Sequence, residues 1–593
     1  MKLIKPITSM IKFFSELKEL GKLWPFLRRH KKNIIIAALL IPVISLLQMS
    51  LPLIVKHTID TGIVPKQADE IYFGVLLGVI AVTGEYLARA AQTLVSAQAV
   101  HRMIQHMRGT LIQHIMKLSS KFHDHSMSGA LVTRATSDFD NLSESLNQGV
   151  LTSVVDLAVL GGALIGLFVL NWKLALISLV ILPIVVTVVV FFSKLLKKSM
   201  LIARSKIAAL NAFTQECLYG IRTVKTLNGE AMAQEKLDKL AENYRKAQMK
   251  SVTSDALLFA ILDGVSSITT GIVLWLAVTR LTSSDNLTVG VMVAFIQYIQ
   301  NLFDPLKQLG NKIAMLQGAF TSLERIFTIL DKKEFISGEA ESILKQGSIH
   351  FRDVSFRYNK DDPTSHNVLN HISFDLPSGK SLALVGATGS GKSTVIKLLT
   401  KLYDGYEGEI QIDGQELKTI EEHSLREHIA IVPQDIVLFE GSVLFNITLG
   451  HENISRDDAI KAARLVGAES FIRNLSEGYD TNLKEGGANL SVGQRQLLAF
   501  ARAIVKAPKI IVLDEATSSV DPKSEADIQR AITNILKDRT VIVIAHRLST
   551  IRRCDEILVM KYGKIIERGS HNNLLSQKGS YYQLHSSMIN EQP

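Results

Sequence analysis

A glycine-rich segment with one lysine and a following hydroxyl residue has the composition and spacing of a phosphate-binding loop. Its glycines allow backbone N–H groups to surround a β-phosphate at the start of a helix. In such a loop the lysine, Lys392, reaches the β- and γ-phosphates, and the Ser393 hydroxyl coordinates Mg²⁺. The residues predicted to bind the nucleotide here are Gly386, Ala387, Thr388, Gly389, Ser390, Gly391, Lys392, Ser393 and Thr394.

The segments on either side of the loop are those that a phosphate-binding loop requires. Residues 382–385 form a short apolar run of the kind expected for a buried parallel strand, and residues 394–399 suit a helix. The alternative, a glycine-rich turn that contains a lysine by chance, does not account for this strand–loop–helix order. We therefore predict a nucleoside triphosphate site.

Two acidic residues follow a second apolar run, residues 510–513. Asp514 ends that run, so its carboxylate is expected at the carboxyl edge of a parallel sheet, where ligands bind in open α/β folds. We predict that Asp514 is a partner of Mg²⁺. The adjacent Glu515 is the candidate base that orients and polarises an attacking water.

A pentapeptide between the loop and the acidic pair identifies the kind of ATPase. It closely resembles the LSGGQ signature of the ATP-binding cassette (ABC) family, with Val492 at a position where glycine is usual. Its residues are Leu490, Ser491, Val492, Gly493 and Gln494. The resemblance implies an α/β P-loop NTPase cassette in the C-terminal half that binds ATP and Mg²⁺.

The same resemblance assigns roles to four further residues. Tyr358 matches the aromatic residue that stacks on adenine, and Gln434 matches the glutamine that contacts Mg²⁺ and couples to the membrane domain. Asp521 lies in a segment that resembles the loop exchanged between two cassettes, and His546 matches the histidine that contacts the γ-phosphate. Each match is weak alone, but their order and spacing together are specific.

In the ABC family the signature completes the ATP site of the opposite cassette, and this chain has one loop and one signature. A second half-transporter is therefore expected as partner. Val492 is harmless if its position has an ordinary φ; otherwise it weakens the site that the signature completes, because a β-branched residue tolerates neither unusual φ nor close phosphate approach. The second case resembles heterodimeric bacterial exporters and favours a heterodimer over a homodimer.

The N-terminal half is predicted to cross a membrane. Hydrophobic residues make up 47% of the chain and concentrate before about residue 310, in blocks near the ~20 residues that a crossing helix requires. A cluster of Lys and Arg before the first block places the N-terminus and the ATPase domain in the cytoplasm. The six predicted transmembrane helices are residues 33–55, 71–91, 150–170, 173–192, 257–278 and 288–306.

The connections at 92–149 and 193–256 are long, polar and helix-compatible, so they are expected to be membrane helices extended into the cytoplasm. Residues 128–138 and 220–225 resemble the coupling regions of type I exporters. The predicted fold class is multidomain, with an all-α six-helix transmembrane domain followed by the cassette. The predicted domains are residues 1–32, a cytoplasmic segment; 33–320, the transmembrane domain; 321–346, a linker; and 347–593, the nucleotide-binding domain.

Charge and cysteine content fit a multi-pass membrane protein. The net charge is +10, but the basic residues lie mostly beside the apolar blocks, as positive-inside orientation requires, so we predict a lipid environment and no nucleic acid. Cys217 and Cys554 are expected to be reduced thiols, and no signal peptide is evident. A bacterial inner membrane is the expected location.

Four ionisable residues fall inside the apolar blocks: Glu85, Arg89, Asp156 and Asp263. Intramembrane charges are costly and often mark a transport pathway. Glu85 and Arg89 are spaced to pair on one helix face, so a structural role is an equal alternative.

The leading functional hypothesis is an ATP-driven exporter or flippase. ATP binding would pair two cassettes and turn the membrane cavity outward, and hydrolysis would reset it. The substrate class expected from the resemblance is a hydrophobic or amphipathic small molecule, a lipid or a peptide. The alternatives are a channel or regulatory subunit and a soluble ABC-type ATPase acting on DNA, which the apolar blocks argue against.

Overall fold

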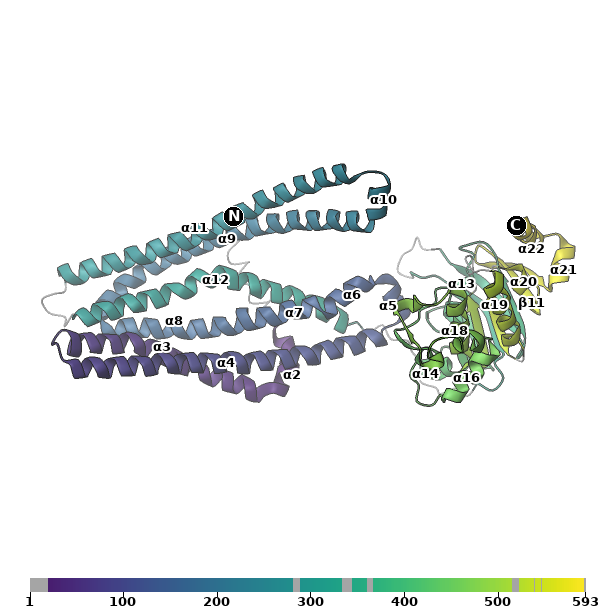
Figure 1. Cartoon of the computed structure of the whole chain (residues 1–593), viewed down its shortest axis with the longest axis horizontal. Coiled ribbons are helices and arrows are strands. Elements are labelled where there is room, and N and C mark those ends of the chain that lie inside the picture. The colour runs from purple at the N-terminus through teal and green to yellow at the C-terminus, as the bar shows by residue number, and fades with distance from the viewer. Residues whose placement is uncertain are drawn as a thin grey trace. The chain divides into compact units, whose positions relative to one another are not determined.

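The computed structural model describes residues 20–280, 288–332, 344–359, 366–514, 522–537, 539–545 and 547–590 of the 593-residue chain. The chain divides into two compact units (Figure 1). The first unit is Met1–Met116 with Met127–Lys332, and the second is Lys117–Ser126 with Lys333–Pro593. A short segment between two stretches of the first unit therefore belongs to the second.

The first unit is built from helices, several of which are far longer than a bilayer crossing. Among them, α4 has 50 residues, α9 has 48 and α11 has 51, against the ~20 residues that span a hydrocarbon core. These lengths agree with the expectation of membrane helices that continue well beyond a bilayer. The α-helices of this unit are α2 Trp24–Leu27, α3 Lys31–His57, α4 Ala68–Lys117, α6 Ser128–Ala135, α7 Ser137–Glu144, α8 Thr152–Leu170, α9 Trp172–Tyr219, α10 Ile221–Thr226, α11 Glu230–Arg280 and α12 Val289–Leu330.

Short 3₁₀ and π segments join these helices: η1 Leu20–Leu23, η2 Arg28–His30, η3 Thr58–Ile63 and η4 Ser145–Leu151. The six predicted apolar blocks all lie in helical structure, apart from Thr288, which caps α12. By length and composition, four helical segments within the described residues are candidates to cross a membrane: Gly21–Ile63, Ala68–Lys117, Ser128–Leu170 and Glu230–Leu276. The count of six crossings stays a prediction.

The core of the first unit lies where α3, α8 and α12 meet. The Tyr298 ring of α12 packs against Gly166 of α8, where a Cβ atom would lie 2.6 Å from the ring. The Tyr298 hydroxyl donates to the Met49 carbonyl of α3 at 2.5 Å. Gly166 thus permits close approach of α8 and α12, and the buried Tyr298 hydroxyl has a hydrogen-bond partner on α3. Helices α9 and α11 pack along one another in the same unit (Figure 1).

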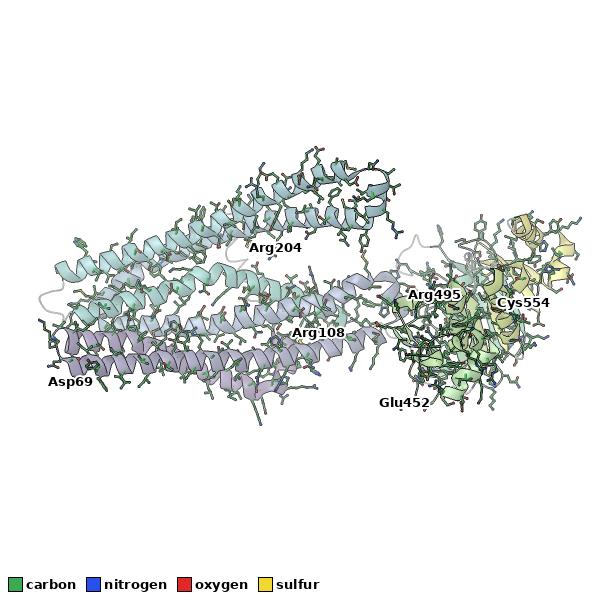
Figure 2. The ribbon with its side chains drawn as sticks, in the orientation of Figure 1. Asp69, Arg108, Arg204, Glu452, Arg495 and Cys554 are labelled. Carbon is green, nitrogen blue, oxygen red and sulfur yellow. The ribbon has the colours of Figure 1, made fainter. Side chains whose placement is uncertain are left out.

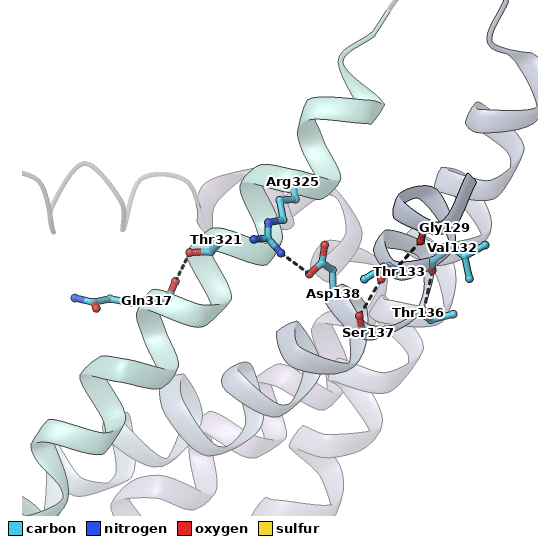
Figure 3. A network of polar contacts seen from close by, with 9 residues as sticks. All are labelled: Gly129, Val132, Thr133, Thr136, Ser137, Asp138, Gln317, Thr321 and Arg325. Atoms are coloured by element: carbon cyan, nitrogen blue, oxygen red, sulfur yellow. Dashed lines mark hydrogen bonds and ion pairs between the residues drawn. The ribbon is translucent and has the colours of Figure 1, made fainter. Parts of the chain in front are cut away.

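A polar network ties α7 to α12 (Figure 3). Asp138, whose side chain is 4% exposed, forms an ion pair with Arg325 at 3.4 Å. At the start of α7, Thr136 has φ −117° and ψ −87°, which are not helical angles, so this residue separates α6 from α7. Its hydroxyl donates to the Val132 carbonyl at 2.8 Å, and its backbone N–H donates to the same carbonyl at 3.0 Å. Residues 128–138, predicted as a coupling region, therefore lie within the first unit.

The second unit is built on a six-stranded sheet with the order β12-β11-β3-β10-β9-β6, in which only β12 is antiparallel to its neighbour. The central strands β3, β9 and β10 are apolar apart from one polar end residue each, Ser381, Asp514 and Thr540, as expected for parallel strands covered on both faces. Alternate residues face two separate cores: Ile511 and Val543 in one, Val512 and Ile542 in the other. A four-stranded antiparallel sheet, β2-β1-β4-β5, packs in the second core.

The strands of this unit are β1 Ile349–Phe356, β2 Leu369–Leu376, β3 Ser381–Val385, β4 Glu407–Ile412, β5 Gln415–Glu416, β6 Ile429–Val432, β7 Gly441–Ser442, β8 Asn482–Leu483, β9 Ile510–Asp514, β10 Thr540–Ile544, β11 Glu556–Lys561 and β12 Lys564–Gly569. Its helices are α5 Ser120–His125, α13 Lys392–Leu399, α14 Glu422–His428, α15 Val443–Thr448, α16 Arg456–Leu465, α17 Glu469–Ile472, η5 Gly478–Asp480, η6 Glu485–Gly487, α18 Val492–Ile504, α19 Pro522–Ile535, α20 Leu548–Ile551, α21 His571–Gln577 and α22 Ser580–Asn590.

Candidate functional site

The predicted phosphate loop joins β3 to α13 and has a backbone that only glycine accommodates. Gly386 has φ +154° and Gly391 has φ +102°. A Cβ atom at Gly386 would lie 2.3 Å from the Met560 carbonyl oxygen, and one at Gly391 would lie 2.7 Å from the Leu369 side chain. The loop therefore forms a backbone cradle at the N-terminus of α13, where N–H groups and the helix dipole favour an anion.

Lys392 begins α13 and folds back over this loop. Its Nζ donates to the Gly386 carbonyl at 2.8 Å and to the Ala387 carbonyl at 3.0 Å. Burial lowers the pKa of Lys392, and the negative charge of Asp514 opposes that shift. The ammonium is thus held by weak acceptors within its own loop, and a phosphate oxygen would be a stronger partner.

Ser390 supplies a second sign that the cradle suits a ligand. The residue is 4% exposed, and its Oγ has no hydrogen-bond partner among the described residues. A buried hydroxyl without a partner costs free energy, so such groups are rare unless a ligand or water completes them. Ser393, one residue after Lys392, is exposed on the first turn of α13.

Asp514 and Gln434 line one open cavity of about 260 Å³. Asp514 ends β9, and Gln434 follows the neighbouring strand β6, so parallel strand ends bring them to the same edge of the sheet. Val492, at the start of α18, lines the same cavity. The described residues contain no cluster of three or more His, Cys, Asp or Glu side chains that would hold a metal ion. The oxygen atoms of Gln434 and Asp514 nevertheless fit Mg²⁺, because this ion is commonly bound by one or two protein oxygens together with substrate phosphates.

Tyr358, the predicted adenine platform, lies just after β1 with its hydroxyl 3.0 Å from the Thr394 hydroxyl. Its ring meets Phe356 and Tyr403 edge to face, with centroids 5.1 Å and 5.0 Å away. Lys397 lies over the Tyr358 ring at 5.7 Å. Tyr358 is therefore a positioned ring beside the phosphate loop helix rather than an isolated surface tyrosine.

The signature segment forms the N-terminus of α18. Ser491 is the N-cap: its Oγ accepts from the Gln494 N–H at 3.2 Å, while its own N–H donates to Gln494 Oε1 at 2.9 Å. This is a reciprocal capping box, in which the glutamine side chain is used to hold the serine. Arg495 in the same helix (Figure 2) donates to the Leu490 carbonyl at 3.1 Å. Leu490 and Gly493 are buried, and Ser491 is exposed.

Val492 has ordinary helical geometry. It is the first residue of α18 and is absent from the positive-φ residues of the described chain. Its side chain is 44% exposed. Of the two outcomes foreseen for this position, the structure has the first: the φ is ordinary, so Val492 causes no backbone strain. An effect of Val492 on the ATP site would have to come from the bulk of its side chain.

Three predicted residues, Glu515, Asp521 and His546, lie outside the described residues. Within the described part, the structure gathers the phosphate loop with Tyr358 at one end of α13, and Gln434 with Asp514 and the signature around the cavity. Sequence reasoning missed Lys397 and Tyr403, which lie against the Tyr358 ring, and Asp124, which contacts both of them. Lys397 has a local signal, one turn beyond the loop, but Asp124 is remote in sequence and nothing local indicates it.

The ionisable residues of the apolar blocks are paired. Arg89 contacts Glu85 at 2.7 Å on the same helix and donates to Gln48 at 3.2 Å. Asp156 pairs with Lys312, and Asp263 pairs with Lys307 at 2.7 Å. The pairing of Glu85 with Arg89 is the structural alternative foreseen from their spacing. A role in a transport pathway stays a prediction for all four.

A unit of long helices joined to a P-loop ATPase with a signature helix defines the class as a membrane transporter driven by ATP. Comparison with known families agrees: residues 34–306 match the family described as "ABC transporter transmembrane region", and residues 369–518 match the family described as "ABC transporter". The predicted order of membrane domain and cassette on one chain is confirmed.

The chain is similar over nearly its full length to known transporters. It is 35% identical to an ATP-dependent lipid A-core flippase of Haemophilus influenzae (strain 86-028NP), covering 97% of each chain. It is 32% identical to YknV, an uncharacterised ABC transporter ATP-binding protein of Bacillus subtilis (strain 168), covering 95% of this chain and 93% of that one. A bacterial Atm1-family ABC exporter solved with ATP bound superposes with a TM-score of 0.77 at 28% identity, covering 95% of this chain and 99% of that chain.

The chain belongs to the ABC transporter family. It is an integral membrane protein of the exporter type that binds and hydrolyses ATP to drive transport. With one membrane region and one cassette, it is a half-transporter that works with a second one. The reading as a soluble ATPase acting on DNA is thereby excluded.

Proposed function

We propose that this half-transporter moves an amphipathic, lipid-like molecule from one leaflet of a bacterial inner membrane toward the other side. ATP binding pairs two cassettes and turns the cavity outward, and hydrolysis resets it. The observation that carries the nucleotide part is the glycine cradle, in which the Ser390 hydroxyl has no partner among the described residues. The capped N-terminus of the signature helix supports it. The substrate class is supported by relatives named lipid A-core flippases at 35% and 33% identity.

Within its own cassette the chain holds ATP through residues of α13 and β1. The loop amides from Gly386 to Thr394 bind the phosphates, and Lys392 exchanges its loop carbonyls for β- and γ-phosphate oxygens. Tyr358 stacks on the adenine. Its ring is already held edge to face by Tyr403 and through the Thr394 hydroxyl, so little side-chain entropy is lost on binding.

Ser393, Gln434 and Asp514 would hold Mg²⁺, which supplies positive charge against the phosphates when bound. Gln434 and Asp514 already share one cavity, and Ser393 is exposed at the head of α13. Glu515 orients and polarises the attacking water, and His546 contacts the γ-phosphate. Glu515 is the next residue in the sequence after β9, which supports this role.

The signature of this chain acts on ATP held by the partner, and Asp521 belongs to the loop exchanged between the two cassettes. Ser491 keeps its hydroxyl proton free to donate to a γ-phosphate, because its Oγ acts only as acceptor in the cap. We propose a heterodimer, since the exposed Val492 side chain stands at the helix N-terminus that a phosphate must approach. The N-terminus and the ATPase domain are proposed to be cytoplasmic.

A Glu515→Gln substitution tests the catalytic proposal. Hydrolysis by the purified transporter should fall by about 10²-fold or more, because water activation is lost, while ATP affinity stays within about twofold. The measurement is phosphate release at saturating ATP beside equilibrium binding of ATP. A variant that hydrolyses ATP at the parental rate would exclude Glu515 as the base.

The substrate proposal is tested in liposomes that contain the transporter with its partner and a fluorescent phospholipid or glycolipid. ATP should accelerate transfer of the labelled lipid between leaflets, and the Glu515→Gln transporter should show no sustained ATP-dependent transfer. If the parental transporter hydrolyses ATP but moves neither lipid, the substrate is not of this class.

A further inference from the structure

Helix α5 lies in the chain between α4 and α6 of the first unit, yet it is part of the second unit. One carboxylate of α5 makes two hydrogen bonds within that unit. Asp124 Oδ2 accepts a hydrogen bond from the Tyr403 hydroxyl at 2.7 Å and another from Lys397 Nζ at 3.1 Å. Burial acts to raise the pKa of Asp124, but the hydrogen bonds from Tyr403 and Lys397 lower it below its usual value. The carboxylate is therefore held as an anion between two donors.

Both donors also contact the ring proposed to stack on adenine. Lys397 Nζ lies 5.7 Å from the centroid of Tyr358 and 5.2 Å from that of Tyr403. The two tyrosine rings meet edge to face, with centroids 5.0 Å apart and planes at 89°. Tyr403 is 5% exposed, so its ring is fixed by the core, and its hydroxyl is the part that reaches Asp124.

These contacts form one continuous chain from α5 to the nucleotide site. Asp124 contacts both the Lys397 ammonium and the Tyr403 hydroxyl, and these two residues in turn lie against the Tyr358 ring, whose hydroxyl is 3.0 Å from that of Thr394. Lys397 and Thr394 both belong to α13, the helix that begins at the phosphate loop. A change at Asp124 therefore affects Tyr358 through Lys397 and Tyr403, which lie against its ring. It affects the phosphate cradle only through the length of α13.

We propose that Asp124 is a positioning residue of the nucleotide site, which holds Lys397 and Tyr403 against Tyr358 and so sets the affinity for the adenine base. The proposal rests on the assignment of Tyr358 as the adenine platform. It implies that adenine binding and the packing of α5 against α13 and Tyr403 strengthen each other. The coupling is mutual, because a contact that raises the affinity of one must raise that of the other by the same factor.

The Lys397–Asp124 ion pair is partly exposed, with side chains 35% and 47% accessible, so by itself it contributes little. The Tyr403 hydrogen bond to an ionised acceptor is stronger. Together they lead us to expect a loss of roughly threefold to tenfold in ATP affinity when the carboxylate is removed, which is the usual range for one such group.

The experiment measures binding of ATP and of inorganic triphosphate, each with Mg²⁺, to the full-length transporter in detergent. Asp124→Ala should raise the Kd for ATP about threefold to tenfold and leave the Kd for triphosphate within about twofold. Asp124→Asn keeps an oxygen for Tyr403 but loses the charge near Lys397, so it should lie between. Asp480→Ala, which removes an exposed carboxylate paired with Arg456 at 2.7 Å, is the matched control and should change neither value.

Tyr358→Ala separates this proposal from the assignment on which it rests. If Tyr358→Ala weakens ATP but not triphosphate, the platform is supported, and a double variant with Asp124→Ala should then lose little more than Tyr358→Ala alone. With that result, an Asp124→Ala variant that binds ATP normally, or that loses ATP and triphosphate affinity equally, overturns the positioning role alone. If Tyr358→Ala leaves ATP affinity unchanged, the platform itself fails, and the positioning role falls with it.

Discussion

Two residues of the phosphate loop, Lys392 and Ser390, carry buried polar groups that differ in their hydrogen bonding. Lys392 uses two carbonyls of its own loop as acceptors, whereas the buried Ser390 Oγ has no partner among the described residues. An unsatisfied buried hydroxyl costs on the order of 1–3 kcal/mol. The loop therefore gives up folding stability at the place where phosphate oxygens are expected.

Ser390→Ala should separate stability from binding. The nucleotide-free transporter should unfold at the same temperature or a higher one, because the variant removes an unsatisfied polar atom without creating a large cavity. The upward shift of that temperature by saturating ATP should shrink, corresponding to a Kd weakened about threefold to thirtyfold. Thermal unfolding with and without ATP checks both parts. An unchanged shift would mean that the hydroxyl does not meet the nucleotide.

At the scale of elements, α18 is held at its start by side chains of the signature itself. Ser491 and Gln494 cap each other's backbone N–H, so the glutamine supports the serine rather than pointing at a ligand. Loss of a helix cap costs about 0.5–2 kcal/mol. The cap keeps the helix N-terminus rigid where the partner's phosphate would bind.

Gln494→Ala should therefore lower ATP hydrolysis several-fold and leave the affinity of the chain's own ATP site unchanged, because that site uses α13 instead. Gln494→Glu retains a side-chain oxygen for the Ser491 N–H and is the matched variant, expected to keep more activity. Steady-state hydrolysis and ATP binding by the same preparation give the comparison. Equal loss in both variants would show that the cap is not what the glutamine provides.

A second element-scale feature is the ion pair between α7 and α12 shown in Figure 3. Asp138 is buried, and Arg325, 57% exposed, is its partner at 3.4 Å. Arg325→Ala leaves a buried carboxylate without its cation, so it should destabilise the transporter by roughly 1–3 kcal/mol. Asp140, 73% exposed and paired with Arg108, offers the control: Asp140→Ala should cost less than about 1 kcal/mol. Chemical unfolding in detergent compares the two, and equal costs would mean that the burial of Asp138 is unimportant.

For the whole molecule, function depends on a site that one chain cannot complete. The chain carries one phosphate loop and one signature. Val492, which stands in the signature where glycine is usual, begins α18 and has no positive φ. In the proposed assembly, an effect of Val492 would therefore be steric and would act in the ATP site of the partner. In the proposed heterodimer that partner site lacks its own base, so most hydrolysis occurs where this chain supplies Glu515.

Val492→Gly consequently distinguishes the two assemblies. In a heterodimer the total rate of ATP hydrolysis should stay within about twofold, because the altered signature serves the weakly hydrolysing site. In a homodimer the same change reaches both sites and should raise the rate several-fold, since glycine permits closer phosphate approach. The rate is measured on the chain purified alone and with its partner. A chain that alone is a dimer and gains activity from Val492→Gly would contradict the heterodimer.

Much of the fold was predictable because its signals are local. Apolar runs of about the ~20 residues that cross a bilayer indicate membrane helices, and short aliphatic runs before a glycine-rich loop and before Asp514 indicate buried parallel strands. Chemistry that depends on adjacent residues, as in the phosphate loop and the signature, was accessible for the same reason. The family follows from these motifs alone.

What the sequence by itself determined is therefore the fold class, the ATPase chemistry and the need for a partner. Only the tertiary structure decided that Val492 is unstrained, that the buried Ser390 Oγ has no partner in the described part of the chain, and that α5 rather than residues 128–138 belongs with the cassette. It also brought Asp124 to Tyr403, although the two residues lie 279 positions apart in the sequence. These facts depend on backbone angles, burial and long-range contacts, which are set by how separated segments pack and not by the order of neighbouring residues.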